Sequence, residues 1–288
     1  MVIGELLSDA SYILKDHGIS NPYNEALILL SFALGCEKSR LFAHSDENVP
    51  EEMREVFSGY VDKRKKRVPV VYITGKAWFM SLEFEIEPGI LIPRPETEGL
   101  VEEILNQAAF YNQDSVKLLD MCCGSGCIGI SAAYYEKNIT ADLVDINPAC
   151  VQASLKNTAK HNLGERVTVT ESDLFTGVKG KAYDIIASNP PYIPSDQIAG
   201  LDDDVRLYEP LSALDGGRDG LDFYKKLAEE AKRHLAPLGH IILEAGIGQS
   251  EKIVGLLESG GFDSISIKND LQGIPRIITA SASSIQLK

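Results

Sequence analysis

Basic residues, cysteines and long apolar runs are all scarce in this sequence of 288 residues. It has 28 Lys and Arg residues against 42 Asp and Glu residues, which gives a formal net charge of −14. Nucleic acid phosphates and anionic membranes both attract positive fields, so this balance argues against direct binding to either. The longest uncharged run, Met121 to Tyr135, is too short and too rich in glycine to span a bilayer.

The few cysteines do not form a metal-binding pattern. Cys123 and Cys127 are close, but the residues between them belong to a glycine-rich motif, and no cluster of Cys or His completes a zinc site. The N-terminal stretch "MVIGELLSDASYILKD" lacks the cationic start and long apolar core of a secretion signal. We therefore expect a soluble, cytoplasmic protein with reduced thiols and no bound metal. The five cysteines are Cys36, Cys122, Cys123, Cys127 and Cys150.

The first 70 residues have the apolar period of helices. The expected helices cover residues 3–17, 22–34 and 50–68. Gly18 supplies a stop after the first, and Asn21 and Pro22 start the second. Residues 1–70 are therefore expected to form a small helical bundle.

A basic run, "KRKKR" from Lys63 to Arg67, stands out against the acidic composition. Cations suit the negative C-terminus of a helix, so a solvated helix end is the favoured interpretation. The alternative is a patch for an acidic or RNA-bound partner.

Residues 71–95 change to a period of two. The stretch "FEIEPGILIP" alternates apolar and polar residues around Pro88 and Gly89, which predicts a β-hairpin linker that turns there. After it, strands and helices alternate to the end, and we expect an α/β domain over residues 96–288, a doubly wound, mainly parallel, seven-stranded sheet. The expected strands cover residues 116–121, 140–145, 166–170, 183–188, 240–244, 264–267 and 276–280.

A glycine-rich turn follows the first of these strands. In "LLDMCCGSGCIGISAA", Gly124, Gly126 and Gly129 have the G-x-G-x-x-G spacing, and Asp145 ends the next strand about twenty residues later. An acidic residue at this position can accept hydrogen bonds from the hydroxyls of a ribose. Both NAD-type cofactors and S-adenosylmethionine contain a ribose, so the ligand is expected to be one of these two. Asp120 is expected to face the crevice, where it repels a pyrophosphate and attracts an ammonium or sulfonium group, which favours S-adenosylmethionine.

The third strand of the domain is followed by "ESDLF". Asp173 can accept a hydrogen bond from an adenine amino group there, and Leu174 can cover the ring. The competing interpretation of Asp173 is a helix or turn cap.

The fourth strand ends in "NPPY", Asn189 to Tyr192. The Asn189 side-chain oxygen and the Pro190 carbonyl can accept both N–H bonds of one planar –NH2 group, with Pro191 fixing the angle and Tyr192 forming a flat wall. This arrangement suits methylation of an amide or exocyclic amine, because it orients the nitrogen lone pair for attack. A rigid proline turn with no chemical role is the alternative.

With these motifs the sequence resembles the class I S-adenosylmethionine-dependent methyltransferases, and more narrowly the release factor glutamine methyltransferases of the HemK/PrmC family. The resemblance covers nearly the whole chain. It rests on "PVVYITGKAWFMSLEFEIEPGILIPRPETE", "DMCCGSG", "DIN", "NPPY", "EPLSALDGGRDGLDFY", "LEAGIGQ" and "DLQGIPRI", among which "LIPRPETE" ahead of a glycine turn and "NPPY" is the most specific.

The resemblance implies methyl transfer to the glutamine of the Gly-Gly-Gln loop of peptide chain release factors, with S-adenosylhomocysteine as product and the helical bundle docking the substrate. By position, the stretch from Cys122 through Cys123, Gly124 and Ser125 to Gly126 would line the methionine part of the cofactor. Asp145 would bind the ribose and Leu174 would cover the adenine. Asn189, Pro190, Pro191 and Tyr192 would hold the glutamine, and Asn189 would also touch the cofactor. Arg94, Glu96 and Thr97 would form a lid or hinge.

The sequence departs from the family pattern at three of these positions. Cys122 stands where the family has a glycine, Cys123 where it has threonine, and Leu174 where some members have tryptophan. We expect these differences to affect cofactor affinity more than the type of reaction. Two other functions stay open: an amino methyltransferase acting on adenine or guanine in nucleic acid, and an inactive, cofactor-binding regulatory protein.

Overall fold

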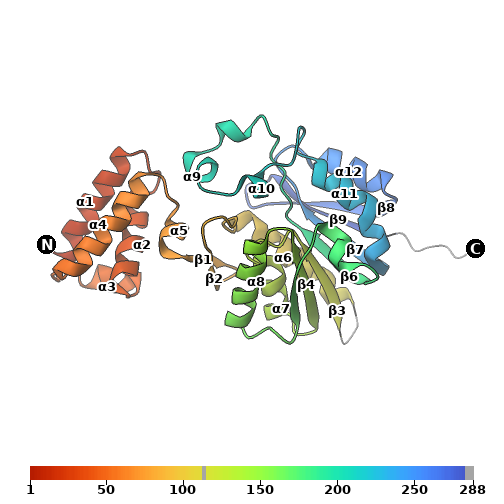
Figure 1. Ribbon diagram of the computed structural model, residues 1–288, viewed down its shortest axis with the longest axis horizontal. Helices are drawn as coiled ribbons and strands as arrows, with labels where there is room; N and C mark the ends of the chain where they lie inside the picture. The colour runs from red at the N-terminus through yellow and green to blue at the C-terminus, as the bar shows by residue number, and fades with distance from the viewer. Residues whose placement is uncertain (112–114, 283–288) are drawn as a thin grey trace, which may run out of the picture. The chain divides into compact units, whose positions relative to one another are not determined.

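The structure, a computed structural model, describes residues 1–111 and 115–282 (Figure 1). It divides into two compact units. The helical unit comprises Met1–Lys76 together with Asp202–Tyr208, and the α/β unit comprises Ala77–Leu201 with the described residues from Glu209 onward. The segment Asp202–Tyr208 thus belongs with the helices, although it comes after "NPPY" in the sequence.

The helical unit contains the three predicted helices and three shorter ones. The three long helices bury their apolar stripes, including Leu14, Leu30 and Phe57, in one core. Gly35 ends the second helix in the left-handed conformation that glycine favours (φ 60°). The helices are α1 (Ile3–Asp16), α2 (Pro22–Leu34), α3 (Lys38–Ala43), α4 (Glu51–Lys65), α5 (Val70–Thr74) and α9 (Asp203–Arg206).

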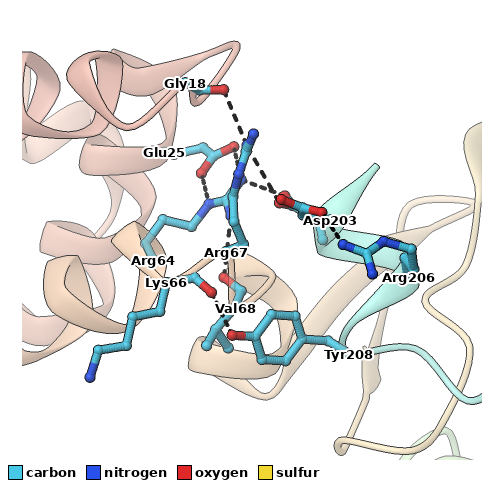
Figure 2. Close-up of polar contacts among 10 residues, drawn as sticks. Gly18, Glu25, Arg64, Lys66, Arg67, Val68, Asp203, Arg206 and Tyr208 are labelled. Atoms are coloured by element: carbon cyan, nitrogen blue, oxygen red, sulfur yellow. Dashed lines mark hydrogen bonds and ion pairs between the residues drawn. The ribbon is translucent and has the colours of Figure 1, made fainter. Parts of the chain in front are cut away.

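The basic run at the end of α4 is partly structural (Figure 2). Arg64 is only 4% exposed and contacts two carboxylates: Nε pairs with Glu25, and Nη2 lies 2.6 Å from Oδ2 of Asp204. Arg67 donates to the carbonyl of Gly18 at 3.1 Å. The interpretation as a solvated helix end is therefore wrong for Arg64, which is buried because opposite charges within the same unit compensate it.

The segment Asp202–Tyr208 is fastened to the helices at two points. Asp204 accepts the hydrogen bond from Arg64. The Tyr208 hydroxyl donates to the carbonyl of Lys66 at 2.5 Å (Figure 2). Lys63 and Lys66 keep exposed side chains.

The β-hairpin lies earlier than predicted. It consists of β1 (Lys76–Phe79) and β2 (Leu82–Glu85), and the turn is formed by Met80 and Ser81, with φ of 50° and 58°. Two successive left-handed residues favour Asn and Gly, so the sequence gives no turn signal at Met-Ser. Pro88 and Gly89 do form a turn, in which the Ile90 amide donates to the Glu87 carbonyl at 3.2 Å, but this turn follows β2 and does not join the two strands of the hairpin. A residue outside the hairpin stabilises the hairpin turn: the Met80 amide donates a hydrogen bond to the Glu98 carboxylate at 2.6 Å.

The α/β unit contains the predicted seven-stranded sheet, in the order β5-β4-β3-β6-β7-β9-β8. Neighbouring strands are parallel except that β9 runs antiparallel to both β7 and β8. The strands are β3 (Val116–Met121), β4 (Ile139–Asp145), β5 (Val167–Glu171), β6 (Tyr183–Ser188), β7 (Leu235–Glu244), β8 (Phe262–Asn269) and β9 (Pro275–Ala282).

Helices cover both faces of this sheet. Three helices, α6 (Glu98–Phe110), α7 (Cys127–Tyr135) and α8 (Pro148–Lys160), lie on one face, and α11 (Asp222–Glu230) and α12 (Ser250–Ser259) lie on the other (Figure 1). Both faces are apolar, so the central strands are buried, and every residue of β6 is buried. Shorter elements are α10 (Leu211–Leu214) and the 3-10 turns η1 (Pro95–Thr97), η2 (Leu174–Val178), η3 (Ile198–Gly200) and η4 (Ala231–His234).

Within residues 1–111 and 115–282, no helix combines the length and apolar character needed to cross a membrane. The same residues contain no group of three or more His, Cys, Asp or Glu side chains that could hold a metal ion.

Candidate active site

The strand order reverses between β3 and β6, and this is where ligands bind in open α/β sheets. Met121 and Ser188 are paired at the carboxyl ends of these two strands, and the Ser188 hydroxyl donates to the Met121 carbonyl at 2.7 Å. The next residues, Cys122 and Asn189, therefore begin their loops side by side.

A cavity of about 320 Å³ opens at this edge of the sheet. Its volume lies at the small end of the range for small-molecule sites, about 300–1,000 Å³. Most of the predicted cofactor residues line it: Cys122, Cys123, Gly124, Ser125, Asp145, Asp173, Leu174 and Asn189.

The glycine turn is fixed by Asp145. The Gly124 amide donates to Oδ2 of Asp145 and the Asn147 amide donates to Oδ1, both at 2.9 Å. Burial raises the pKa of Asp145, and these amides oppose the rise. The carboxylate therefore braces the turn while it remains on the cavity wall.

Glycine is required next to this turn for two different reasons. Gly124 has φ 56°, and a Cβ built there would meet nothing within 4 Å, so the backbone at this point is open to a ligand. A Cβ at Gly129 would lie 2.7 Å from Leu143, so this glycine allows α7 to pack closely on the sheet. Gly126 is equally crowded and does not line the cavity.

Asp120 occupies a different place from the one expected. It is completely buried, does not line the cavity, and accepts a hydrogen bond from the Gly129 amide at 2.9 Å. Burial raises the pKa of Asp120 to about 7. Its side chain thus holds the start of α7 instead of facing the crevice, because the strand end directs it beneath the turn.

The backbone at Cys122 is left-handed, with φ 60°. Glycine adopts this conformation without strain, which gives a physical reason for the family's glycine at this position. Burial raises the pKa of the Cys122 thiol strongly, with the nearby Asp145 carboxylate adding to the rise. A neutral thiol therefore lines the cavity here.

The loop after β5 reaches the cavity beside Asp145, since Asp145 pairs with Glu171 in the sheet. Leu174 is half-buried and lines the cavity with φ 48°, held by the Ser172 hydroxyl, which donates to its carbonyl at 2.6 Å. Asp173 is exposed and makes no side-chain capping hydrogen bond to η2. The helix-cap interpretation of Asp173 therefore has no support in the structure.

The "NPPY" loop contributes Asn189 and Pro191 to the cavity wall, but not Pro190 or Tyr192. Asn189 donates from Nδ2 to the Thr97 hydroxyl at 3.1 Å. Tyr192 packs against the apolar core, and its carbonyl accepts from Gln249 at 2.8 Å. Burial raises the pKa of Tyr192, so this side chain remains neutral.

Two further parts of the wall were only partly indicated by the sequence. The first comprises Leu91, Pro93, Arg94 and Thr97, of which Arg94 and Thr97 were expected to form a lid or hinge. Arg94 lies 2.5 Å from the Glu209 carboxylate. The second comprises Pro210, Ser212, Ala213, Phe223 and Lys226, on either side of a loop. The motif "EPLSALDGGRDGLDFY" contains most residues of the second part without indicating which of them face a ligand.

The sheet order and the cavity at its switch point define a Rossmann-like methyltransferase fold. A methyltransferase from Pyrococcus furiosus has the same fold, with a TM-score of 0.54 and 18% identity over 77% of this chain and 99% of that one. A 16S rRNA N2 G1207 methyltransferase from T. thermophilus (RsmC), solved in complex with AdoMet and guanosine, gives a TM-score of 0.53 with 18% identity over 72% of this chain and 50% of that one.

The sequence comparisons are more specific. The family model for the PrmC N-terminal domain matches residues 5–75, and that for the methyltransferase small domain matches residues 97–200. The release factor glutamine methyltransferase of Clostridium acetobutylicum is 38% identical over 97% of this chain and 98% of its own length. The chain belongs to the release factor glutamine methyltransferase family.

Proposed function

We propose that this protein methylates the side-chain amide nitrogen of the glutamine in the Gly-Gly-Gln loop of peptide chain release factors, with S-adenosylmethionine as methyl donor. The observation that carries the proposal is that Asn189 lies on the wall of the switch-point cavity in a chain that matches the family over nearly its whole length. An amide oxygen at that point can accept a hydrogen bond from the –NH2 group of a glutamine.

The residues of the cavity suit the proposed donor. The open backbone at Gly124 leaves room for the methionine part, and the Asp145 carboxylate can accept from the ribose hydroxyls. Leu174 would cover the adenine, and Asp173 would accept from its amino group. When bound, S-adenosylmethionine supplies an electrophilic methyl group and is released as S-adenosylhomocysteine.

The residues of this chain have two tasks in the reaction. Asn189, on the cavity wall, accepts one N–H bond of the glutamine amide through its side-chain oxygen. Pro190, the next residue, lies outside that wall and accepts the other N–H bond through its carbonyl, so that the nitrogen lone pair is oriented. Both acceptors stabilise the positive charge that develops on nitrogen during attack. One N–H proton then leaves to water, and no strong base is needed beforehand.

The test is incubation of the purified protein with release factor and labelled S-adenosylmethionine, followed by mass spectrometry. We expect a single methyl group on the Gly-Gly-Gln glutamine, and none on a release factor in which that glutamine is replaced by alanine. Labelled oligonucleotide with unlabelled release factor would refute the proposal and favour a nucleic-acid methyltransferase. Labelling of neither substrate, with cofactor bound, would favour a regulatory protein.

The helical unit is proposed to dock the release factor. It exposes several aromatic side chains, among them Tyr12 and Phe42, and two lysines of the basic run, Lys63 and Lys66. An exposed ion pair contributes up to about 1 kcal/mol, so we expect Lys63→Glu with Lys66→Glu to raise KM for release factor about threefold to tenfold. The matched control is Lys15→Glu with Lys38→Glu, the same charge change elsewhere on this unit. Equal KM values for the two double variants would exclude the basic run from docking.

A further inference from the structure

Two buried side chains of α8 hold the carbonyls of the glycine turn. The Ser154 hydroxyl donates to the Gly124 carbonyl, and the –NH2 group of Asn157 donates to the Ser125 carbonyl, both at 3.0 Å. Ser154 and Asn157 are three residues apart, so they lie on the same face of the helix, and both are 0% exposed. Neither residue lines the cavity. They therefore contact the turn without contacting the space that a ligand fills.

Asn157 also holds the β1–β2 hairpin. Its Oδ1 atom accepts from the Glu85 amide at 2.8 Å, and its –NH2 group donates to the Glu85 carbonyl at 3.1 Å. Glu85 is the last residue of β2, and the chain runs on from there to Leu91, Pro93 and Arg94 on the cavity wall. One side chain thus joins the glycine turn to the hairpin, and both of these segments lead into the wall of the same cavity.

The orientation of the Asn157 amide is fixed by its three backbone partners. One partner is an N–H donor and two are carbonyl acceptors, so the oxygen must face the Glu85 amide and the –NH2 group must face the two carbonyls. Rotation of the amide by half a turn would break all three hydrogen bonds in a buried site, where water cannot replace them. A buried polar side chain that is satisfied in one arrangement alone specifies that arrangement.

The neighbours of Asn157 on α8 contact either the hairpin or the turn. The Lys160 ammonium pairs with the Glu83 carboxylate at 2.7 Å, and a ring nitrogen of His161 lies 3.0 Å from the Glu83 carbonyl. These two residues hold the hairpin, whereas Ser154 holds the turn. Variants of Lys160 and Ser154 can therefore separate the two contacts that Asn157 combines.

We propose that Asn157 is a positioning residue that couples the glycine turn to the β1–β2 hairpin, so that a ligand held by the turn also stabilises the hairpin. The inference rests on the function proposed above in taking S-adenosylmethionine as the ligand. Movement of the hairpin away from α8 breaks the hydrogen bonds between Asn157 and Glu85 and leaves the Asn157 amide free to release Ser125. A ligand that packs against Ser125 on the cavity wall opposes this opening. By reciprocity, loss of the Asn157 amide weakens binding of the ligand.

The first experiment needs no ligand. NMR of protein labelled with 15N-glutamate follows hydrogen exchange of the Glu85 amide, with Glu85→Gln for assignment. The Glu244 amide is the internal reference, because Glu244 is 1% exposed on β7 and its exchange reports opening of the sheet. We expect Asn157→Ala to speed exchange of Glu85 about tenfold relative to Glu244, because the hydrogen bond to Oδ1 is lost. Equal acceleration of both amides would show a general loss of stability and would overturn the proposal.

The second experiment adds S-adenosylhomocysteine, the product of the proposed reaction, as the probe. Saturating probe should slow exchange of Glu85 about threefold or more in the wild type, although Glu85 does not line the cavity. In Asn157→Ala the Glu85 rate should be the same with and without the probe. An unchanged Glu85 rate in the liganded wild type would overturn the coupling, whether or not Asn157→Ala folds.

The third experiment measures the affinity for S-adenosylhomocysteine by calorimetry. Asn157→Ala should raise the dissociation constant about tenfold. Ser154→Ala should weaken binding to a similar extent but keep the wild-type exchange rate at Glu85, since Ser154 contacts the turn alone. Lys160→Ala removes a partly exposed ion pair of the hairpin and should bind the probe within about twofold of the wild type. Wild-type affinity in Asn157→Ala would exclude the positioning role.

Failure of the wild type to bind S-adenosylhomocysteine would refute both the cofactor of the proposed function and the coupling. Normal binding and normal coupling, without methyl transfer to release factor, would refute the proposed function and leave the role of Asn157 established.

Discussion

Asn189→Ala is expected to lower kcat for release factor about 100-fold to 1,000-fold, the usual effect of losing one preorganised hydrogen-bonding group that acts in the transition state. The variant keeps the backbone of the loop and loses only the amide. Cofactor affinity should stay within about tenfold, or about 1.4 kcal/mol, since Asn189 is one of many residues on the cavity wall. Single-turnover kinetics with calorimetric measurement of cofactor binding separates the two quantities.

Asn162→Ala provides a control for Asn189→Ala, because Asn162 lies in the turn after α8 and does not line the cavity. Its kcat should equal that of the wild type. If Asn189→Ala also turned over normally, the "NPPY" loop would be a structural turn and the proposed role of its acceptors would be wrong.

Asp145→Ala is expected to raise the dissociation constant for S-adenosylmethionine about 100-fold, equal to about 2.7 kcal/mol, as for the loss of two hydrogen bonds to a charged group. The variant also removes the acceptor that braces the amides of Gly124 and Asn147. Both effects act in the same direction, because a loosened glycine turn no longer presents its backbone. Isothermal calorimetry measures the constant directly.

Asp142→Ala is the matched control, since Asp142 lies on the same strand but contacts Lys181 and Tyr183 away from the cavity. It should bind the cofactor as the wild type does. Unchanged affinity in Asp145→Ala would show that this carboxylate serves the turn alone and that the ribose is bound elsewhere.

The centre of the sheet could be predicted from the sequence because the central strands are buried on both faces. Such strands are continuous apolar runs, and the bounds of β3 and β6 were predicted to the residue. The hairpin could not be placed in the same way, because its turn at Met80 and Ser81 is held by Glu98, which is distant in sequence and not part of any local turn pattern.

The site shows the same division between local and non-local information. The glycine turn, Asp145 and "NPPY" are consecutive motifs with fixed spacing, so the sequence indicates them directly. Motif spacing shows which residue lies at the end of a strand, but it does not show where the side chain of that residue points. For this reason Asp120 was expected to face the crevice, whereas its side chain is buried and accepts a hydrogen bond from the Gly129 amide. The contacts of Asn189 with Thr97 and of Arg94 with Glu209 join segments about a hundred residues apart, which only the folded chain brings together.

The ion pairs of Arg64 have a consequence for how this fold can be cut or recombined. Asp204 comes from a stretch of chain that lies within the sequence of the α/β unit. It nevertheless belongs to the helical unit, where it forms an ion pair with the buried Arg64. Removal of the first 76 residues would leave Asp204 and Tyr208 without their partners, and a helical unit expressed alone would keep a buried arginine short of one carboxylate. A chimaera between two relatives therefore needs both stretches from the same parent, since a single crossover after Lys76 separates residues that fold as one body.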